Sequence, residues 1–503
     1  MINITRLFQN LYLPIPIAYK SHSNKSELAL MKLKLPLLLL FALFFISCKK
    51  DDNTSKEVFI KGQIVNPSSK YVIISKNNID LDTFHLNENN QFEGKLKNIK
   101  PGLYVFKHPP ENQVIYLEPG DSTLVWLNTL AFDESINFSG KGAEKSNFLS
   151  NLYLLNEKDN DLILSYYKLD PSEFAQKTDS IRDSRKQELI DLEEKNEISQ
   201  EFFNLANLSI NYEFYDLRER YAFLIRKYNK QMIKRIPSNF HDYRSQVSFD
   251  NEDLEDYYVY LNFIDDFLRT KSIENCPTSS PSNSDCYSLN SYENLKYRIS
   301  LVDSLITNEQ IKNTFLDRLV SQGIVYSQKS DNLDSILSLL KQTDYTGDLK
   351  DELNTMAKNQ LIFLPGNNLS ERKYLTMNGD TVKYKNFTKR PSITYRWTSS
   401  NPSQHKKQHQ IISDLRVKYP EVDFIGINLD KETSEDWKKA IFKNYYNTKY
   451  ELKSLNISVD KNVINKYLNK LIFMDNKGTV VRGDLQINTP DLETKILEFI
   501  SQQ

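Results

Sequence analysis

The segment Ser392–Leu415 constrains the fold of this chain more than any other stretch. It begins with an apolar run, Ile393–Trp397, continues with a polar turn, and ends with apolar residues at helical spacing. Asn401 is a good N-cap, because its side chain can accept a hydrogen bond from an exposed amide of the first turn. Pro402 then occupies the first helical position, where its missing N–H is not needed. The segment therefore predicts a strand, a tight turn and a helix.

The neighbouring segments predict a sheet around this strand. Asn378-Gly379 is a strong two-residue turn signal and predicts an entry hairpin. Val422–Asp430 is a nearly continuous apolar run, as expected of a buried parallel strand. Leu471–Val481 predicts a closing hairpin, and an apolar helix is expected to end at Ile500.

These segments, in this order, resemble the thioredoxin-fold proteins over residues 361–503. They are most similar to the TlpA/ResA-like envelope branch, whose signature is roughly F-W-A-x-W-C-x-x-C. Trp397 takes the place of the family Trp, and the family's Cys-x-x-Cys falls on Asn401, Pro402, Ser403 and Gln404. The resemblance implies a thiol–disulfide oxidoreductase fold.

The chemistry that the resemblance implies is missing from the sequence. Thiol–disulfide exchange needs a thiolate and a second, resolving thiol, and the amides of Asn401 and Gln404 supply neither. The family's cis-proline before the closing strand, which faces the cysteines, is replaced by Asn469. A cis bond before a residue other than proline costs about 2.5–4 kcal/mol, so we expect a trans bond there. The sequence predicts a thioredoxin-like domain that has lost redox activity.

The N-terminal residues 1–48 predict an export signal, with Met31 as the expected true start. A basic start is followed by the apolar run Leu35–Ile46 and by Ser47-Cys48, which resembles a lipobox. Cys48 is then the expected lipidation site, and residues 49–56 form a charged tether. This predicts a lipid anchor in the outer membrane of the cell envelope, on either its periplasmic face or the cell surface.

Cysteine usage agrees with export, because only Cys276 and Cys286 remain after Cys48. They bracket a Ser/Pro-rich stretch with turn chemistry, which favours a structural disulfide. On the loop-entropy model such a bond stabilises the fold by roughly 2.5–3 kcal/mol. Two free thiols and a redox-active pair remain as alternatives.

Two further regions precede the thioredoxin-like one. Residues 57–140 carry short β-branched and aromatic runs separated by turn residues, which predicts a small antiparallel β domain. It resembles the uncharacterised β domain that precedes the thioredoxin domain in many TlpA-like lipoproteins. Residues 145–360 change to helical periodicity and predict a helical middle domain. Its acidic residues are interpreted as a solvated helix face: Glu252, Asp253, Asp256, Asp265 and Asp266.

Composition excludes several functions. The chain has 65 basic and 66 acidic residues, which gives no reason to expect a nucleic-acid partner. Glycine is scarce, with 13 residues, and there is no phosphate-binding loop, so no cofactor is expected. His405 and His409 lie four apart, a spacing that suits a metal pair, but a third ligand is not evident. We expect both to be solvent-facing. A Ser400 or Ser403 nucleophile with His405 as base lacks an oxyanion-hole signature.

The sequence therefore predicts an α+β multidomain chain with a β domain, a helical middle domain and a thioredoxin-like α/β domain. The favoured function is binding or scaffolding of a peptide or a partner protein without catalysis. The first alternative is a TlpA-like thiol–disulfide oxidoreductase in cell redox homeostasis. The second is an accessory lipoprotein of nutrient uptake at the cell surface.

Overall fold

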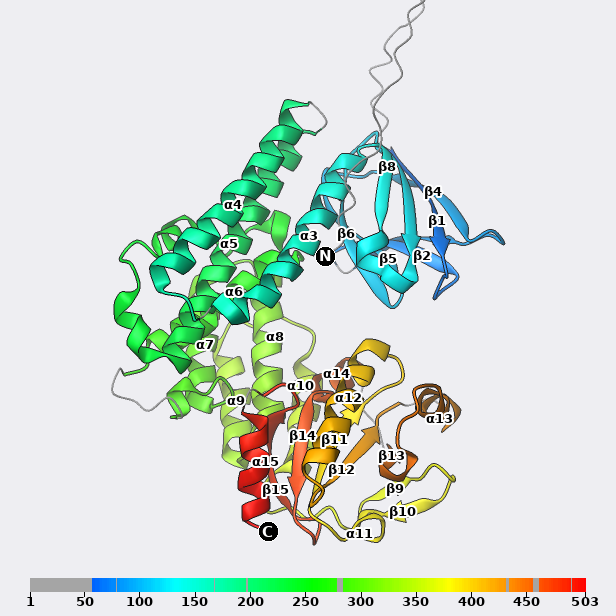
Figure 1. Ribbon diagram of the computed structural model, residues 1–503, viewed down its shortest axis with the longest axis vertical. Coiled ribbons are helices and arrows are strands. Elements are labelled where there is room, and N and C mark those ends of the chain that lie inside the picture. The colour runs from blue at the N-terminus through cyan, green and yellow to red at the C-terminus, as the bar shows by residue number, and fades with distance from the viewer. Residues whose placement is uncertain are drawn as a thin grey trace, which may run out of the picture. The chain divides into compact units, whose positions relative to one another are not determined.

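The computed structural model describes residues 57–77, 79–166, 168–195, 198–277, 284–430, 434–455, 461–489 and 491–503. The expected signal segment, Cys48 and the tether 49–56 lie outside this part of the chain. Among the helices that it does describe, none has the length and apolar character needed to cross a membrane. The chain is a mixture of helices and sheets, as predicted (Figure 1).

Residues 57–141 form two four-stranded sheets that enclose a common apolar core. One sheet has the order β4-β1-β7-β8, with the strands β1 (Glu57–Val65), β4 (Gln91–Lys97), β7 (Ser122–Asn128) and β8 (Asn137–Lys141). The other has the order β3-β2-β5-β6, with β2 (Tyr71–Lys76), β3 (Ile79–His85), β5 (Gly102–His108) and β6 (Glu111–Leu117). Strict alternation of buried and exposed residues along β7 shows that one face of its sheet covers the core.

The expectation of an antiparallel β domain is wrong for one strand pair. β1 and β7 run parallel, with Phe59 opposite Ser122 and Val65 opposite Asn128. Parallel neighbours need a long connection, and here the whole second sheet and β4 lie between the two strands in the sequence. The other strand pairs described in these two sheets are antiparallel.

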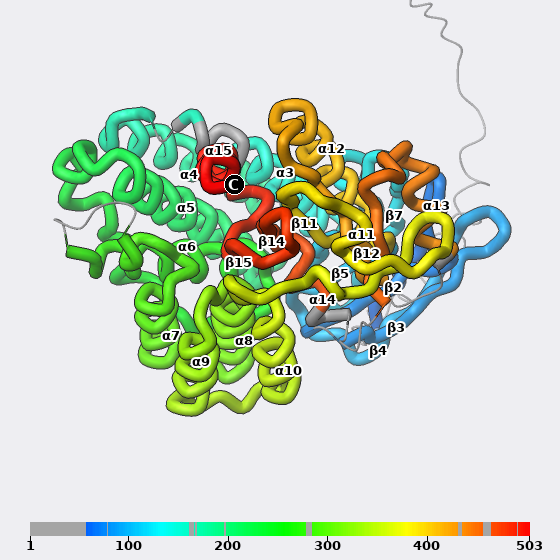
Figure 2. Tube along the Cα trace, turned by 90° about the horizontal axis from the view of Figure 1, so that it is seen from below, coloured from blue at the N-terminus to red at the C-terminus, as the bar shows by residue number. Residues whose placement is uncertain are grey.

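Helices dominate the middle of the chain. They are α3 (Ala143–Tyr166), α4 (Pro171–Glu194), α5 (Gln200–Tyr228), α6 (Tyr258–Glu274), α7 (Tyr292–Leu305), α8 (Glu309–Tyr326), α9 (Ser330–Gln342) and α10 (Lys350–Gln360). Figure 2 shows α7 to α10 gathered side by side. Their apolar faces share one large core, which also includes Tyr116 of β6.

The interpretation of the acidic residues as a solvated face is wrong for Asp265. This carboxylate on α6 is buried and contacts Arg269, one turn further along the helix. Burial of a carboxylate is expected only with such a partner. Glu252 and Asp253, in contrast, are exposed in a short 3-10 helix.

The last region is built on a seven-stranded sheet with the order β10-β9-β13-β12-β11-β14-β15. Its strands are β9 (Lys373–Leu375), β10 (Thr381–Lys383), β11 (Ser392–Trp397), β12 (Asp423–Asn428), β13 (Glu451–Ser454), β14 (Lys470–Met474) and β15 (Val480–Gln486). Its helices are α11 (Tyr384–Phe387), α12 (Pro402–Lys418), α13 (Ser434–Lys443), α14 (Lys461–Tyr467) and α15 (Leu492–Ser501).

The strand–turn–helix predicted from Ser392–Leu415 is confirmed as β11 and α12. β11 lies in the interior of the sheet, parallel to β12 and antiparallel to β14. All six of its residues are buried. Tyr395 and Trp397 therefore point to one face and Arg396 to the other, and the face of Tyr395 and Trp397 packs with Ile412 and Leu415 of α12.

Candidate functional site

The turn between β11 and α12 holds the positions where the family's cysteines were expected. The Asn401 side-chain oxygen accepts a hydrogen bond of 3.2 Å from the backbone N–H of Gln404, so Asn401 is the N-cap of α12. Pro402 is the first helical residue. Asp430, after β12, accepts from the Ser399 N–H at 3.0 and 3.1 Å. The turn is fixed by these side-chain caps rather than by a thiol pair.

Two glutamines join this helix to the loop that carries Asn469. The side-chain amides of Gln404 and Gln408 both donate to the backbone carbonyl of Leu468, and the distance from Gln404 is 3.5 Å. Among the described residues only the Pro109–Pro110 bond is cis, so the bond before Asn469 is trans. The structure thus brings the expected cysteine positions and the expected proline position together. Amide side chains fill the space between them.

The prediction that His405 and His409 face solvent is wrong, because both side chains are buried beneath α12. His405 Nδ1 lies 2.6 Å from the hydroxyl of Tyr446. Burial, followed by the neighbouring His409, lowers the pKa of His405 to about 4. His405 is therefore neutral near pH 7 and serves as a hydrogen-bond partner within the core.

His409 has its ring fixed on three sides. Its Nδ1 lies 2.7 Å from the backbone carbonyl oxygen of His405, and because a carbonyl only accepts, Nδ1 carries a proton. The ring stacks on Tyr446, with 3.5 Å between the ring centres and 4° between the planes. Its Nε2 lies 3.3 Å from a carboxylate oxygen of Glu451. The two groups attract each other only when a proton lies between them.

Glu451 is the centre of this cluster and was not predicted as a site residue. One carboxylate oxygen accepts from the Tyr395 hydroxyl at 2.8 Å and the other from Trp397 Nε1 at 3.0 Å. Arg416 Nη2 lies 3.9 Å away. Burial and the Glu451 charge raise the pKa of Tyr395 well above its usual value. The set below is called the Glu451 cluster: Tyr395, Trp397, His405, His409, Arg416, Tyr446 and Glu451.

A missing side chain makes room for the carboxylate. Gly426 of β12 lies opposite Glu451 of β13, and a Cβ there would come within 2.2 Å of the Glu451 carboxylate. The glycine in an otherwise apolar buried strand was the one sequence signal for a bulky neighbour at this position.

The acid–base side chains of the Glu451 cluster are His405, His409 and Glu451. They are buried against each other instead of opening to a substrate. No hydrogen bond between described residues joins His405 to Ser400 or Ser403, which argues against the serine–histidine alternative. Within the described residues, no group of three or more His, Cys, Asp or Glu side chains could hold a metal ion.

The expected disulfide between Cys276 and Cys286 is present, and it lies in the helical region. Cys276 follows α6 and packs with Ile273 and Tyr287, with Phe223 of α5 beside them. These neighbours belong to the helical middle of the chain, not to β11 or α12.

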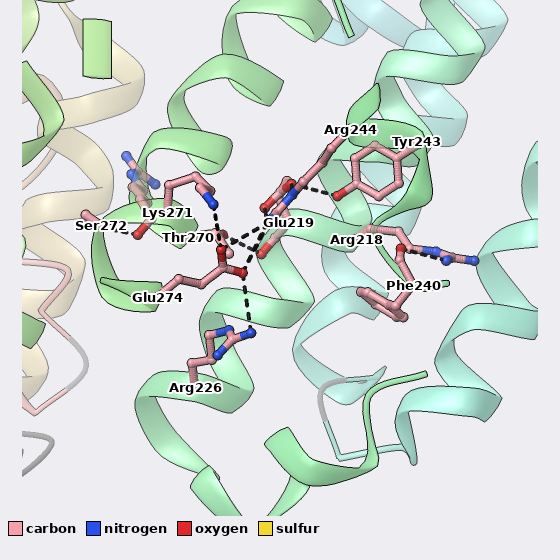
Figure 3. A network of polar contacts seen from close by, with 11 residues as sticks. Arg218, Glu219, Arg226, Phe240, Tyr243, Arg244, Thr270, Lys271, Ser272 and Glu274 are labelled. Atoms are coloured by element: carbon pink, nitrogen blue, oxygen red, sulfur yellow. Dashed lines mark hydrogen bonds and ion pairs between the residues drawn. The ribbon is translucent and has the colours of Figure 1, made fainter. Parts of the chain in front are cut away.

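A second polar network lies between α5, α6 and the 3-10 helix η3 (Asp242–Gln246) (Figure 3). Glu219 is fully buried and accepts two hydrogen bonds of 2.7 Å from Arg244 and one of 2.7 Å from the Tyr243 hydroxyl. Arg244 also contacts Glu274 at 3.1 Å. Burial raises the pKa of Glu219, and Arg244 counteracts that rise. Each charge in this network has an opposite charge beside it, which marks a structural ion pair.

Known structures resemble part of this chain. The thioredoxin domain of a thiol-disulfide oxidoreductase from Bacteroides vulgatus is 20% identical over 27% of this chain and 97% of its own, with a TM-score of 0.23. A domain of a possible thiol-disulfide isomerase from Cytophaga hutchinsonii is 12% identical over 28% of this chain and 95% of its own, with a TM-score of 0.23. A thioredoxin-like match thus covers about 27% of the chain. No family model and no curated protein matches the sequence.

Proposed function

We propose that this chain is a lipid-anchored protein of the cell envelope whose thioredoxin-like region binds a peptide or a partner protein without redox chemistry. One observation carries the proposal. Asn401 and Gln404, at the expected cysteine positions, cap α12 and bridge to the Leu468 carbonyl. Side chains that hold the turn closed have replaced the pair that a redox reaction needs.

The surface beside this turn offers contacts for a partner. Phe442 on α13 and Tyr445 just after it are 65% and 95% exposed. The next residue, Tyr446, is fixed against His405 and His409 of α12, so the end of α13 and the residues after it are tied to the helix that begins at Pro402. Large aromatic side chains of this kind are enriched in the contact surfaces of protein complexes.

The absence of redox activity is tested by insulin reduction with dithiothreitol. The purified chain is expected to show no turnover above background. A variant with Asn401→Cys and Gln404→Cys is the matched positive control, because it restores the spacing at a helix N-terminus, where thiol pKa values fall. Turnover by the unmodified chain that Cys276→Ser abolishes would contradict the proposal.

Partner binding is tested by a photo-crosslinking amino acid placed at Tyr445 in living cells. Val417, 82% exposed in the last turn of α12, is the matched control, because it lies at the end of α12 opposite to the turn at Pro402. We expect a discrete crosslinked product from position 445 and none from 417. Equal crosslinking from both positions would show that the loop is not a specific contact.

The lipid anchor is tested separately by metabolic labelling with a fatty acid. We expect label in the protein and its complete loss in Cys48→Ser. Label retained in that variant would exclude Cys48 as the modified residue.

A further inference from the structure

The two outer faces of the β sandwich have different surroundings. The face of the sheet β3-β2-β5-β6 packs against the helical core through Tyr116, with Leu103 and Val114 beside it. The outer face of the sheet β4-β1-β7-β8 has large apolar side chains that stay exposed: Phe59 at 47%, Leu124 at 41% and Trp126 at 46%. Within the part of the chain that the structure describes, only one of the two faces is covered by other elements.

Strand register places these apolar side chains together. Phe59 lies on β1, and Leu124 and Trp126 lie on β7, the parallel strand beside it. These are the two inner strands of the sheet, since β4 and β8 form its edges. Leu130, in the turn directly after β7, adds a fourth side chain that is 80% exposed. Together they form an apolar strip, defined here as Phe59, Leu124, Trp126 and Leu130.

Lysines outnumber acidic residues at the outward positions of the same sheet face. Four lysines and two glutamates occupy outward-facing positions along β1, β4 and β8: Lys61, Lys95, Lys97, Lys141, Glu57 and Glu93. Lys95 pairs with Glu57 and also lies 5.2 Å from the centre of the Phe59 ring. The face is therefore positively charged around an apolar centre, although the whole chain is nearly neutral.

We propose that this face rests on a lipid bilayer with anionic headgroups. Tryptophan is favoured at the boundary between headgroups and acyl chains, and lysines close to an anionic membrane contribute roughly 1 kcal/mol each. The position of the expected lipid anchor in the sequence agrees with this proposal. Cys48, the lipid anchor in the proposed function, lies nine residues before Glu57, so β1 stays within about 30 Å of the membrane even when that segment is extended. The occupant is thus the membrane to which the chain is tethered.

Tryptophan fluorescence offers a direct test, because the chain has three tryptophans and two of them, Trp397 and Trp437, are fully buried. A chain that starts at Lys49 is used, so that neither the apolar run nor Cys48 is present. Residues 56–503 form a compact unit of their own, which this truncation leaves intact. We expect a blue shift of Trp126 emission with vesicles of phosphatidylglycerol and phosphatidylcholine. The shift is expected to be much smaller with phosphatidylcholine alone and to decrease with added salt.

Variants separate the two parts of the surface. Trp126→Ala with Leu124→Ala, and separately Lys61→Glu with Lys141→Glu, are each expected to weaken co-sedimentation with the anionic vesicles by about tenfold or more. Val417→Ala and Lys407→Glu, at exposed positions of the last region, are the matched controls and should bind as the unmodified chain does. A urea midpoint equal to that of the unmodified chain confirms that each variant folds.

Three results would overturn the proposal. These are no shift with either vesicle, equal binding of the two vesicles at low salt, or unchanged binding by both double variants. No shift with vesicles would assign the face to a protein partner instead. Because the tested chain lacks Cys48, the outcome is independent of whether lipidation, the anchor part of the proposed function, holds.

Discussion

Two buried glutamates of the described chain, Glu219 and Glu451, are held in different ways, and a third, Glu213, lies on α5 with Glu219. Glu219 lies between helices and meets the guanidinium of Arg244 at 2.7 Å through both of its oxygens. Glu451 lies on a sheet and is bound by the neutral groups of Tyr395 and Trp397, with the nearest guanidinium, that of Arg416, at 3.9 Å. The first is a compensated ion pair, and the second is a carboxylate solvated by neutral donors.

The difference separates a network of ion pairs from a carboxylate that is held mainly by neutral donors. The Glu219 network links α5, α6 and η3, and every charge in it has an opposite neighbour (Figure 3). The Glu451 cluster lies beneath the turn where the cysteines were expected and includes two buried histidines. Tyr395 and Trp397 both donate to Glu451, while His409 Nε2 has no hydrogen-bond partner among the described residues.

The largest predicted loss of stability is in the Glu219 network of the helical region. Glu219→Gln removes the charge that compensates Arg244, and breaking a buried pair typically costs about 3–5 kcal/mol. Chemical denaturation should show that loss of stability. Glu274→Gln is the matched control, because Glu274 is only half-buried and meets Arg244 at the longer distance of 3.1 Å; its effect should be clearly smaller. Equal losses would mean that the network is not centred on Glu219.

Glu451→Gln is expected to destabilise the chain by about 2 kcal/mol, less than the change at Glu219. The carbonyl oxygen of the amide can still accept a hydrogen bond from Tyr395 or from Trp397, but its NH2 group then faces the other donor. One hydrogen bond to a charged group is therefore lost, and such bonds are worth about 1.5–3 kcal/mol. The measurement is urea unfolding followed by the emission of the buried Trp397 and Trp437. A loss as large as that of Glu219→Gln would show that Glu451 is an ion-paired group after all.

Acid should weaken the last region through His405. Its folded-state pKa of about 4 lies below the usual 6.5, so the unfolded chain binds more protons and stability falls as pH falls from 6.5 to about 4. The expected loss by pH 4 is about 3 kcal/mol. His405→Gln should remove that part of the pH dependence. The matched variant is His241→Gln in the helical region. Burial and the neighbouring Arg244 lower the pKa of His241 to about 3. Unchanged acid sensitivity in His405→Gln would contradict the burial of this ring.

A smaller effect than that of Glu219→Gln is also expected from Gly426→Ala. The added Cβ would meet the Glu451 carboxylate at 2.2 Å, and overpacking of this kind costs about 1–3 kcal/mol. The double variant with Glu451→Ala should recover part of that loss, since the obstructing group is then absent. Strictly additive effects in this double-mutant cycle would show that the two residues do not contact each other.

Local sequence signals predicted the elements around the turn but not its interior. The strand, the N-cap and the helix of Ser392–Leu415 follow from residues next to each other. The burial of His405 and His409 was also readable, because both continue the helical stripe of Ile412 and Leu415 at spacings of three and four residues. Assigning them to solvent from their polarity alone was the error.

Other features depend on contacts that local sequence does not contain. Glu451 meets Tyr395 and Trp397 only because three parallel strands bring them side by side. β8 has one apolar residue in five, Phe138, and so lacks the apolar alternation that identifies a strand in the sequence. The parallel pairing of β1 with β7 likewise depends on how the whole sandwich closes.

The central claim, that the chain keeps no redox-active thiol pair, is tested most directly by counting thiols. The chain that starts at Lys49 contains only Cys276 and Cys286. The account predicts no reactive thiol in the native or the denatured protein without reductant, and two after denaturation and reduction together. Rapid reduction of the Cys276–Cys286 bond in the native protein by mild dithiothreitol would contradict it, and would place a redox site in the helical region.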